Sequence, residues 1–192
     1  MNEPVILPKK IVLLCGLKGS GKDTCTDLIC DTFRNQFYKT SFAKKLKEEV
    51  MRLWDVPEMF FRDRTLKETV LNGCGKTPRE LCMEHGTNAR RIRGADCWAD
   101  ACIKDIQENS FHLDVVISDC RFPNEVMKMR YQWLDDNVTT IWIDRPGIVR
   151  DPGHESENSL FPEMCDYVIT NSGSKALLAN KLYLIIQHTR LQ

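Results

Sequence analysis

The segment from Gly16 to Thr24, which reads GLKGSGKDT, has the residue types and spacing that bind the phosphates of a nucleotide. Its glycines let backbone N–H groups converge on one anion, and Lys22 can reach the outer phosphates of a nucleoside triphosphate. The segment follows the apolar run 11–15 and opens a helical pattern at residue 22. Because a helix that begins at such a turn adds the positive end of its dipole, the order of strand, glycine-rich turn and helix predicts a P-loop.

The residues after Lys22 depart from the usual pattern, in which a serine or threonine follows the lysine directly. Here Asp23 follows it and Thr24 comes next. We expect the hydroxyl of Thr24 to face a magnesium ion. Two interpretations stay open for Asp23: a hydrogen bond to a substrate or an arginine, or a first-turn carboxylate that the helix dipole favours.

The apolar run 113–118 ends at an acidic residue, Asp119, and Arg121 follows two positions later. An acid at the tip of a buried strand is the Walker-B arrangement, which can hold magnesium opposite the hydroxyl of the P-loop. A buried carboxylate without such a partner is costly. The order of strand, Ser-Asp-Cys-Arg and helix places Arg121 at the mouth of the site. Because a first-turn arginine is unfavourable for the helix dipole, we favour a functional role for it.

A second group of basic residues lies between residues 77 and 98, where four arginines occur within fifteen residues. Guanidinium groups bind a phosphate monoester through paired hydrogen bonds. We expect Arg79 and Arg91 to do so, although a solvated helix face explains any single arginine equally well. Trp98 either stacks on a base or packs in the core, and its spacing favours the core.

Residues 144–157 form a third region, with Arg145 at the end of a predicted strand and Arg150 in a segment rich in proline and glycine. Phosphoryl transfer depends mainly on positioning and on neutralising the charge of the transferred group. An arginine on a closing lid meets that need and helps to exclude water. Three further residues are interpreted as anchors of the lid or of an acceptor pocket: His154, Glu155 and Glu157.

The last predicted strand is followed by Asn171. Two interpretations stay open for this residue. It could contact the adenine of a donor nucleotide, or it could cap the helix that begins near residue 174.

Apolar, strand-like runs alternate with helical patterns along the chain, which predicts an α/β fold with a mostly parallel sheet covered by helices. Residues 86–87 are expected to interrupt or bend the helix that contains them. Segments 55–76 and 145–163 fit no element, and we interpret them as part of an acceptor-binding insert and as a lid, with ordinary surface loops as the alternative. The predicted strands are 11–15, 38–42, 113–118, 138–144 and 166–170. The predicted helices are 22–36, 43–54, 77–92, 96–109, 122–136 and 174–190.

The bulk properties of the chain set limits on its class. Its 192 residues suffice for a single α/β domain with a substantial core. A net charge of zero argues against broad electrostatic binding to polymeric nucleic acid or to an acidic membrane. No apolar run approaches the ~20 residues that span a bilayer, and the N-terminus lacks the features of a signal peptide. The nine cysteines, none in a C-x-x-C pair, indicate buried thiols in a reducing, intracellular compartment.

Together these motifs resemble the deoxynucleoside monophosphate kinases of tailed bacteriophages. The matching stretches are GLKGSGKDT, SFAKKLKEEV, PRELCMEHGTNARR through DCW, VVISDCRFPNEV, WIDRPG, and HESENSL followed by DYVITNSGS, in the family's order and over most of the chain. The resemblance implies a P-loop nucleoside monophosphate kinase fold, with a five-stranded parallel sheet, an acceptor-binding region at about 43–98 and a lid at about 145–163. It implies transfer of the γ-phosphate of ATP to a deoxynucleoside monophosphate with Mg²⁺, a homodimer, and the cytoplasm of an infected host cell.

The resemblance also assigns site residues. Those implied to bind ATP are Gly19, Ser20, Gly21, Lys22, Asp23 and Thr24. Those implied to bind the acceptor are Lys18, Lys47, Arg79, Gly86, Thr87, Arg91, Asp96, Trp98, Arg121, Glu125, His154, Glu155, Ser156 and Glu157. With the residue-based expectations above, the catalytic set is Lys22, Asp119, Arg121, Arg145 and Arg150, and the magnesium ligands are Thr24 and Asp119. The chain departs from the family pattern at Lys44-Lys45 and at Asn88, both on the acceptor side, so the choice of base, modified pyrimidines included, stays open.

Other readings of the same motifs remain. Phosphomevalonate kinase shares a G-K-D loop, a Ser-Asp strand end and an acidic lid, but an isoprenoid phosphate needs no stacking aromatics such as Phe42 and Trp98. A kinase that acts on modified pyrimidines within DNA is disfavoured by the absence of a basic stripe in the sequence. A protein that binds ATP without transferring phosphate predicts ATP binding and no acceptor-dependent turnover.

Overall fold

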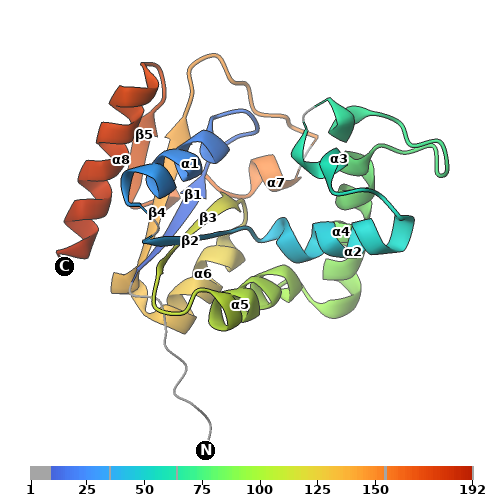
Figure 1. Ribbon diagram of the computed structural model, residues 1–192, viewed down its shortest axis with the longest axis horizontal. Coiled ribbons are helices and arrows are strands. Elements are labelled where there is room, and N and C mark those ends of the chain that lie inside the picture. Colours follow the sequence, from blue (N-terminus) through green and yellow to red (C-terminus); the bar gives the residue numbers. More distant parts are fainter. Residues whose placement is uncertain (1–9, 35, 64, 154, 192) are drawn as a thin grey trace, which may run out of the picture. The chain divides into compact units, whose positions relative to one another are not determined.

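A computed structural model describes residues 10–34, 36–63, 65–153 and 155–191 of the chain. Its core is a five-stranded sheet with the order β2-β3-β1-β4-β5, in which every neighbouring pair is parallel (Figure 1). The predicted five-stranded parallel sheet is therefore confirmed. The strands are β1 (Ile11–Cys15), β2 (Phe37–Thr40), β3 (Asp114–Cys120), β4 (Val138–Asp144) and β5 (Tyr167–Thr170).

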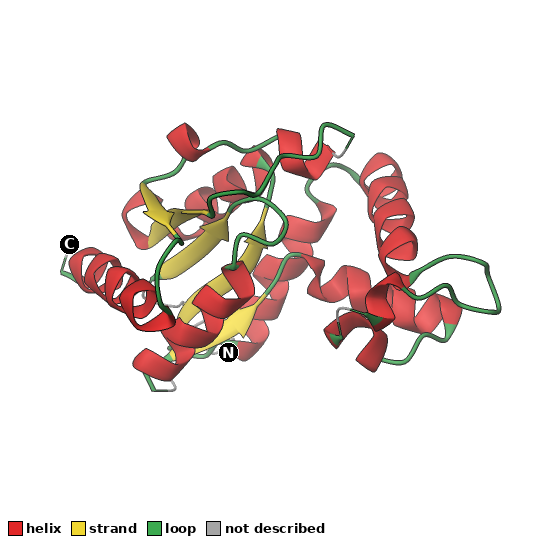
Figure 2. Cartoon of the chain, turned by 90° about the horizontal axis from the view of Figure 1, so that it is seen from above, coloured by secondary structure: helices red, strands yellow, loops and turns green. Residues whose placement is uncertain are grey.

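The central strands are buried on both faces, which fits their predominantly apolar sequences. Figure 2 shows helices on both sides of the sheet. On one side, Val12 and Leu14 of β1 belong to a buried cluster with Ile29 of α1 (Lys22–Thr32) and Leu182 of α8 (Lys175–Arg190). Because side chains alternate along a strand, Leu13 points to the opposite face. Two further helices belong to this fold: α5 (Cys97–Asn109) and α6 (Pro123–Trp133).

The chain divides into two compact units, and the boundary falls within α5. The first unit holds the sheet and comprises the chain up to Ser41 and from Ile103 onward. The second unit is Phe42–Cys102, and the predicted acceptor-binding region lies within it. Its elements are α2 (Ala43–Trp54), α3 (Met59–Arg62), the 3₁₀ turn Leu66–Glu68, α4 (Pro78–Arg93) and the first residues of α5.

Helix α4 runs without a break from Pro78 to Arg93, so the expected interruption at Gly86 and Thr87 is wrong. A glycine inside a helix costs about 1 kcal/mol relative to alanine, but here the position is crowded. A Cβ on Gly86 would lie 3.3 Å from Cδ2 of Leu46 on α2. The glycine therefore allows α2 and α4 to pack closely instead of breaking the helix.

The second unit has a polar centre around Glu49 of α2. Its carboxylate binds both terminal nitrogens of Arg93, at 2.9 and 2.6 Å, and lies 2.7 Å from Nε2 of His85. The guanidinium of Arg93 lies 5.0 Å above the ring of Trp98, whose indole N–H donates to the carbonyl of Gly86 at 3.3 Å. Trp98 is only 3% exposed, so the structure places it in the core of the unit and not as an open stacking surface.

Some boundaries differ from the predicted ones. Helix α1 ends at Thr32 and not at residue 36, because Arg34 has a positive φ of 37° that no regular helix allows. Strand β3 continues to Cys120, so Asp119 is the second-last residue of the strand and does not follow it. The predicted lid contains two short elements, α7 (Glu155–Asn158) and the 3₁₀ turn Pro162–Met164. Within the described ranges, no helix is long and apolar enough to cross a membrane.

We predict that Glu49→Gln destabilises the second unit. The hydrogen bonds of Arg93, and then of His85, lower the pKa of Glu49 to about 2. Its contribution is therefore complete above the unfolded pKa of about 4.3 and is lost as the pH falls towards 2. Denaturant unfolding should show a loss of about 2 kcal/mol at neutral pH, because two partners lose their charged acceptor, and a smaller loss at acid pH.

Glu48→Gln is the matched control for this prediction. Glu48 lies on the same helix in an exposed ion pair with Lys45 at 3.2 Å, and such pairs contribute little. Equal destabilisation by both variants would contradict the role assigned to Glu49.

Candidate active site

The predicted P-loop lies between the end of β1 and the start of α1, at the carboxyl edge of the sheet. Gly16 and Gly21 have φ values of +135° and +105°, which favour glycine. A Cβ on Gly16 would lie 2.6 Å from the carbonyl oxygen of Ile143, so the loop rests directly against β4. The positive φ values and this close backbone approach at Gly16 therefore fix a loop conformation that favours glycine.

Lys22 begins α1 and is 7% exposed. Its ammonium donates to the carbonyls of Gly16 and Leu17, both at 2.7 Å, so the side chain curls over the loop. Burial and the nearby charge of Arg121 lower the pKa of Lys22 to about 8, although the carboxylates of Glu157, Asp23 and Asp119 act in the opposite direction. A cation held in this way gains stability from any phosphate that enters the loop.

Asn171 follows β5 and holds the far side of the P-loop. Its side-chain amide donates to the carbonyl of Ser20 at 2.8 Å, and its backbone N–H donates to the carbonyl of Asp144 at 2.6 Å. A Cβ on Gly21 would lie 2.5 Å from the side-chain amide nitrogen of Asn171. The helix N-cap role is wrong for Asn171, because the hydroxyl of Ser174 accepts from the N–H of Leu177 and caps α8.

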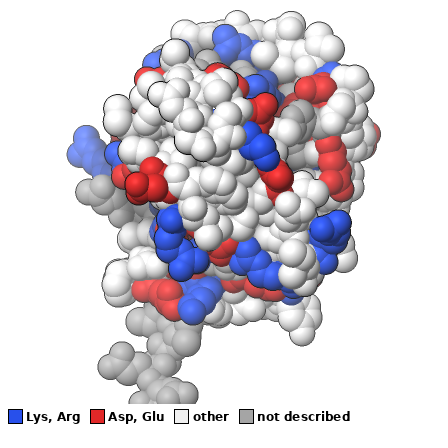
Figure 3. All heavy atoms as spheres, turned by 90° about the vertical axis from the view of Figure 1, so that its right-hand side faces the viewer, with Lys and Arg blue, Asp and Glu red and all other residues white. Residues whose placement is uncertain are grey.

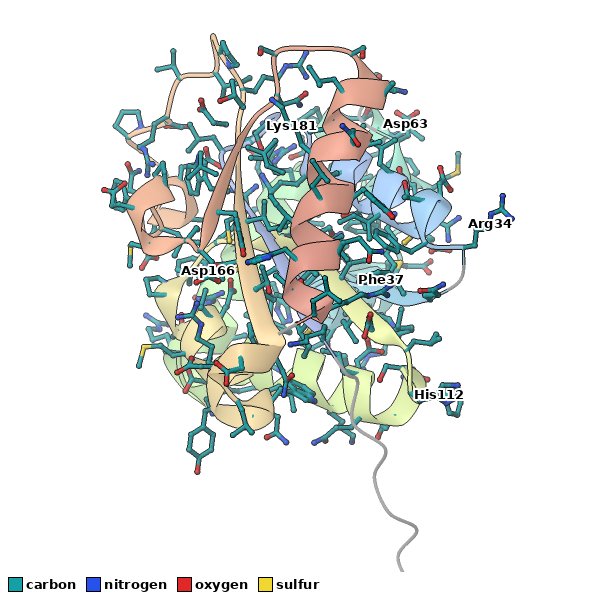
Figure 4. All side chains as sticks on the ribbon, turned by 90° about the vertical axis from the view of Figure 1, so that its left-hand side faces the viewer. Arg34, Phe37, Asp63, His112, Asp166 and Lys181 are labelled. Carbon is teal, nitrogen blue, oxygen red and sulfur yellow. The ribbon has the colours of Figure 1, made fainter. Side chains whose placement is uncertain are left out.

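Hydrogen bonds fix both ends of strand β5, and they therefore fix the position of Asn171, which directly follows the strand. Figure 4 labels Asp166 and Lys181 at these two positions. Asp166 accepts from the backbone N–H of Thr140 at 2.8 Å, just before β5 begins. Lys181 of α8 donates to the carbonyl of Thr170 at 2.9 Å, where β5 ends.

The end of β3 and the start of α6 position Arg121. The carboxylate of Glu125 is 2% exposed and accepts from the backbone N–H groups of Arg121 and Phe122 at 2.9 and 3.1 Å. Glu125 was expected to bind the acceptor, but its carboxylate is engaged with these backbone groups. The guanidinium of Arg121 extends instead to the carboxylate of Glu157.

Glu157 of α7 joins the lid to the P-loop. Its side chain is 6% exposed, and its oxygens lie 3.0 and 3.1 Å from the backbone N–H nitrogen of Lys18. The same carboxylate forms an ion pair with Arg121. The P-loop, the end of β3 and the lid therefore meet at one carboxylate.

The two lid arginines differ in their surroundings. Arg150 donates to the backbone carbonyl of Glu157, and its guanidinium lies 4.2 Å from the ring centre of Phe161. It is therefore part of the internal structure of the lid. Arg145 follows β4 and is exposed.

The residues predicted to hold magnesium suit that ion. Thr24 lies in the first turn of α1 and Asp119 near the end of β3, and both are half-buried. Hydroxyl and carboxylate oxygens are the ligands that Mg²⁺ accepts, with the rest coming from phosphate and water. Within the described part of the chain, no group of three or more His, Cys, Asp or Glu residues could hold a metal ion by itself.

The other predicted acceptor residues have varied surroundings. Arg79 donates to Glu68 at 2.5 Å, Gly86 packs against Leu46, and Arg91 and Thr87 are exposed. All belong to the second unit, as do Lys47, Asp96 and Trp98. On α7, Ser156 is half-buried and Glu155 is exposed. His154 lies outside the described residues.

Sequence reasoning did not find two contacts that shape the site. It assigned Glu157 to the acceptor or lid and not to the P-loop, and it did not place Asn171 against Ser20. These bonds join residues 139 and 151 positions apart. Only the tertiary fold brings them together, and a single sequence carries no direct signal of these contacts.

Three features together define a P-loop kinase: the order of the strands in the sheet, the P-loop after the central strand β1, and the acid and arginine at the end of the neighbouring strand β3. The chain is 32% identical over 170 residues to a protein of Acanthamoeba polyphaga mimivirus named "Putative deoxynucleotide monophosphate kinase", and the match covers 78% of this chain and 81% of that protein. The chain belongs to this deoxynucleotide monophosphate kinase family. No protein-family model matches it.

Solved structures of other kinases resemble the chain more distantly. An APS kinase of Mycobacterium tuberculosis is 13% identical, with a TM-score of 0.49 over 94% of this chain and 99% of that chain. The dephospho-CoA kinase of Campylobacter jejuni is 15% identical, with a TM-score of 0.48 over 92% and 95%. The family assignment rests on the viral relative and not on these structures.

We predict that Asn171→Ala raises the Kd for ATP about tenfold, because the Ser20 carbonyl loses its donor and the P-loop loses order. Calorimetry with ATP and with inorganic triphosphate, which has no base, separates the two roles. If the affinity for both ligands falls by the same factor, Asn171 positions the loop. Loss confined to ATP would assign Asn171 to the adenine, and Asn180→Ala, on the exposed face of α8, is the control.

We also predict that ATP binding takes up a proton at about pH 8.5, where phosphate is fully ionised and Lys22 of the free protein is largely neutral. The bound phosphates stabilise the ammonium and raise its pKa, so affinity falls as the pH rises through about 8. Calorimetry in two buffers of different ionisation enthalpy measures the uptake. Lys22→Arg, which stays charged, should abolish it, and uptake that persists in this variant would exclude Lys22 as its source.

Proposed function

We propose that this protein is a deoxynucleoside monophosphate kinase that transfers the γ-phosphate of ATP to a deoxynucleoside monophosphate and so supplies precursors for viral DNA synthesis. The observation that carries the proposal is the buried Lys22 of the P-loop, together with Arg121, whose guanidinium pairs with the same Glu157 carboxylate that accepts from the P-loop N–H of Lys18. The name of the viral relative supports the choice of a nucleotide acceptor.

On the donor side, the backbone N–H groups of residues 19–24 and the dipole of α1 receive the ATP phosphates. Lys22 leaves the carbonyls of Gly16 and Leu17 and binds the outer phosphates. Thr24 and Asp119 would hold Mg²⁺, which would neutralise part of the phosphate charge. The backbone N–H groups of the loop are already in place, so Lys22 is the donor-side group that must move when the phosphates bind, and little further reorganisation is needed as charge develops.

On the acceptor side, the phosphate is already anionic, so the reaction needs no general base. Arg121 and the Lys18 segment are the proposed contacts of that phosphate in the first unit. Lys47, Arg79 and Arg91 stay predicted contacts in the second unit. Among the lid arginines we favour Arg145 to cap the transferred group, because Arg150 is engaged within the lid.

We expect the substrates to be small molecules and not polymers. On the face shown in Figure 3, basic and acidic side chains are interspersed, and the net charge of the chain is zero. Broad binding of a polyanion needs a continuous basic surface. The homodimer implied by the family stays a prediction.

An assay of ATP consumption with a panel of acceptors tests the proposal. The panel contains each deoxynucleoside monophosphate, 5-hydroxymethylated pyrimidine forms, ribonucleotides and mevalonate phosphate. We predict turnover with at least one deoxynucleotide, and a loss of about 10³-fold or more in Lys22→Ala, because stabilisation of the transferred group is removed. Lys104→Ala, an exposed lysine of α5, should retain activity.

Two outcomes would contradict the proposal. Activity on mevalonate phosphate alone would move the protein to another class of acceptor. ATP binding without turnover of any acceptor would make it a non-catalytic nucleotide-binding protein.

A further inference from the structure

The carboxylate of Glu157 occupies the groups that our proposed function assigns to the acceptor phosphate. It accepts the backbone N–H of Lys18 at the start of the P-loop and pairs with the guanidinium of Arg121. It is 6% exposed, and its charge acts on Lys22. A side chain of the protein thus lies where an anion is expected.

The donors around Glu157 match those that bind a phosphate monoester. A backbone N–H and a guanidinium both donate charge-assisted hydrogen bonds to anionic oxygens, whether carboxylate or phosphate. The two anions cannot share these donors, because like charges a few ångströms apart in a buried site repel strongly. If the phosphate binds here, Glu157 must leave.

The departure of Glu157 would also affect the lid. The backbone carbonyl of Glu157 accepts from Arg150, which is stacked on Phe161 and also lies 3.5 Å from the carbonyl of Leu160. Side chain and main chain of one residue therefore connect the P-loop with the internal structure of the lid.

We propose that Glu157 is an internal competitor of the acceptor phosphate. In the acceptor-free enzyme it neutralises Arg121 and keeps the lid on the P-loop, and an incoming phosphate monoester displaces it. Displacement frees Arg121 to bind the phosphate and frees the lid to rearrange. The identity of the acceptor rests on the proposed function, but the displacement requires only a phosphate monoester.

An alternative role makes the opposite prediction. If Glu157 only positions Arg121 for the acceptor, removing its charge leaves Arg121 misplaced and weakens binding. If Glu157 competes with the acceptor, removing its charge strengthens binding. The sign of the change in Kd therefore decides between the two roles.

Calorimetry on Glu157→Gln provides the test, with saturating Mg·ADP to fill the donor site. The probes are the best deoxynucleoside monophosphate of the panel and inorganic phosphate. We expect the Kd of both probes to fall about tenfold, because a charged competitor of Arg121 is gone. Glu163→Gln, an exposed carboxylate beyond α7, should leave the Kd unchanged. An unchanged or higher Kd in Glu157→Gln would overturn the proposal.

Hydrogen–deuterium exchange on the wild-type protein tests the proposal even if Glu157→Gln does not fold. Acceptor alone should accelerate amide exchange in residues 155–160, because the segment loses its bonds to the P-loop and Arg121. Slower or unchanged exchange in this segment would contradict displacement. The test is separable from the proposed function: a protein that phosphorylates no deoxynucleotide can still show tighter phosphate binding in Glu157→Gln, and an active kinase can show weaker binding.

Discussion

The site depends on one buried positive charge at the carboxyl end of the central strand. Lys22 is almost fully buried, and its ammonium finds two carbonyl acceptors in the loop that precedes it. Carbonyl groups only partly replace water around an ammonium, which is why the pKa of Lys22 falls to about 8. The loop is therefore built around a charge that the protein alone does not fully compensate. A bound phosphate supplies the missing negative charge. Without phosphate, the surrounding carboxylates reduce the free-energy cost of burying the ammonium.

Parallel topology brings the remaining groups to this charge. The P-loop follows β1, Arg121 follows β3, Asp144 ends β4 and Asn171 follows β5, and parallel strands all end at the same edge of the sheet. Residues that are more than a hundred positions apart in the sequence therefore become neighbours, because the ends of their strands lie side by side. The glycines at positions 16 and 21 then allow the loop to approach Ile143 and Asn171 more closely than a Cβ would permit, and Asn171 holds the loop through its hydrogen bond to the Ser20 carbonyl.

The sequence predicted the fold better than the contacts of the site. Strands 11–15 and 138–144 and helix 43–54 have the predicted bounds, because continuous apolar runs and a clear helical period define them locally. The interruption predicted at Gly86 is wrong, because in a sequence a glycine that allows two helices to pack closely looks the same as a glycine that ends a helix. The roles of Glu157 and Asn171 could not be predicted, because their partners are set by tertiary structure. Trp98 was ambiguous in the sequence, and burial decided in favour of the core.

The bonds of the lid fall into two groups that have different consequences. Arg150, stacked on Phe161 and bonded to the carbonyls of Glu157 and Leu160, holds the lid together by aromatic and backbone contacts that an incoming anion does not compete for. The carboxylate of Glu157 holds the lid to the P-loop through charge, which an incoming anion does compete for. A phosphate can therefore detach the lid from the loop without dismantling the lid itself. In a kinase that must admit one substrate and then exclude water, this division lets the acceptor release the lid from the P-loop while the lid keeps its internal structure, so that the lid can rearrange over the bound acceptor.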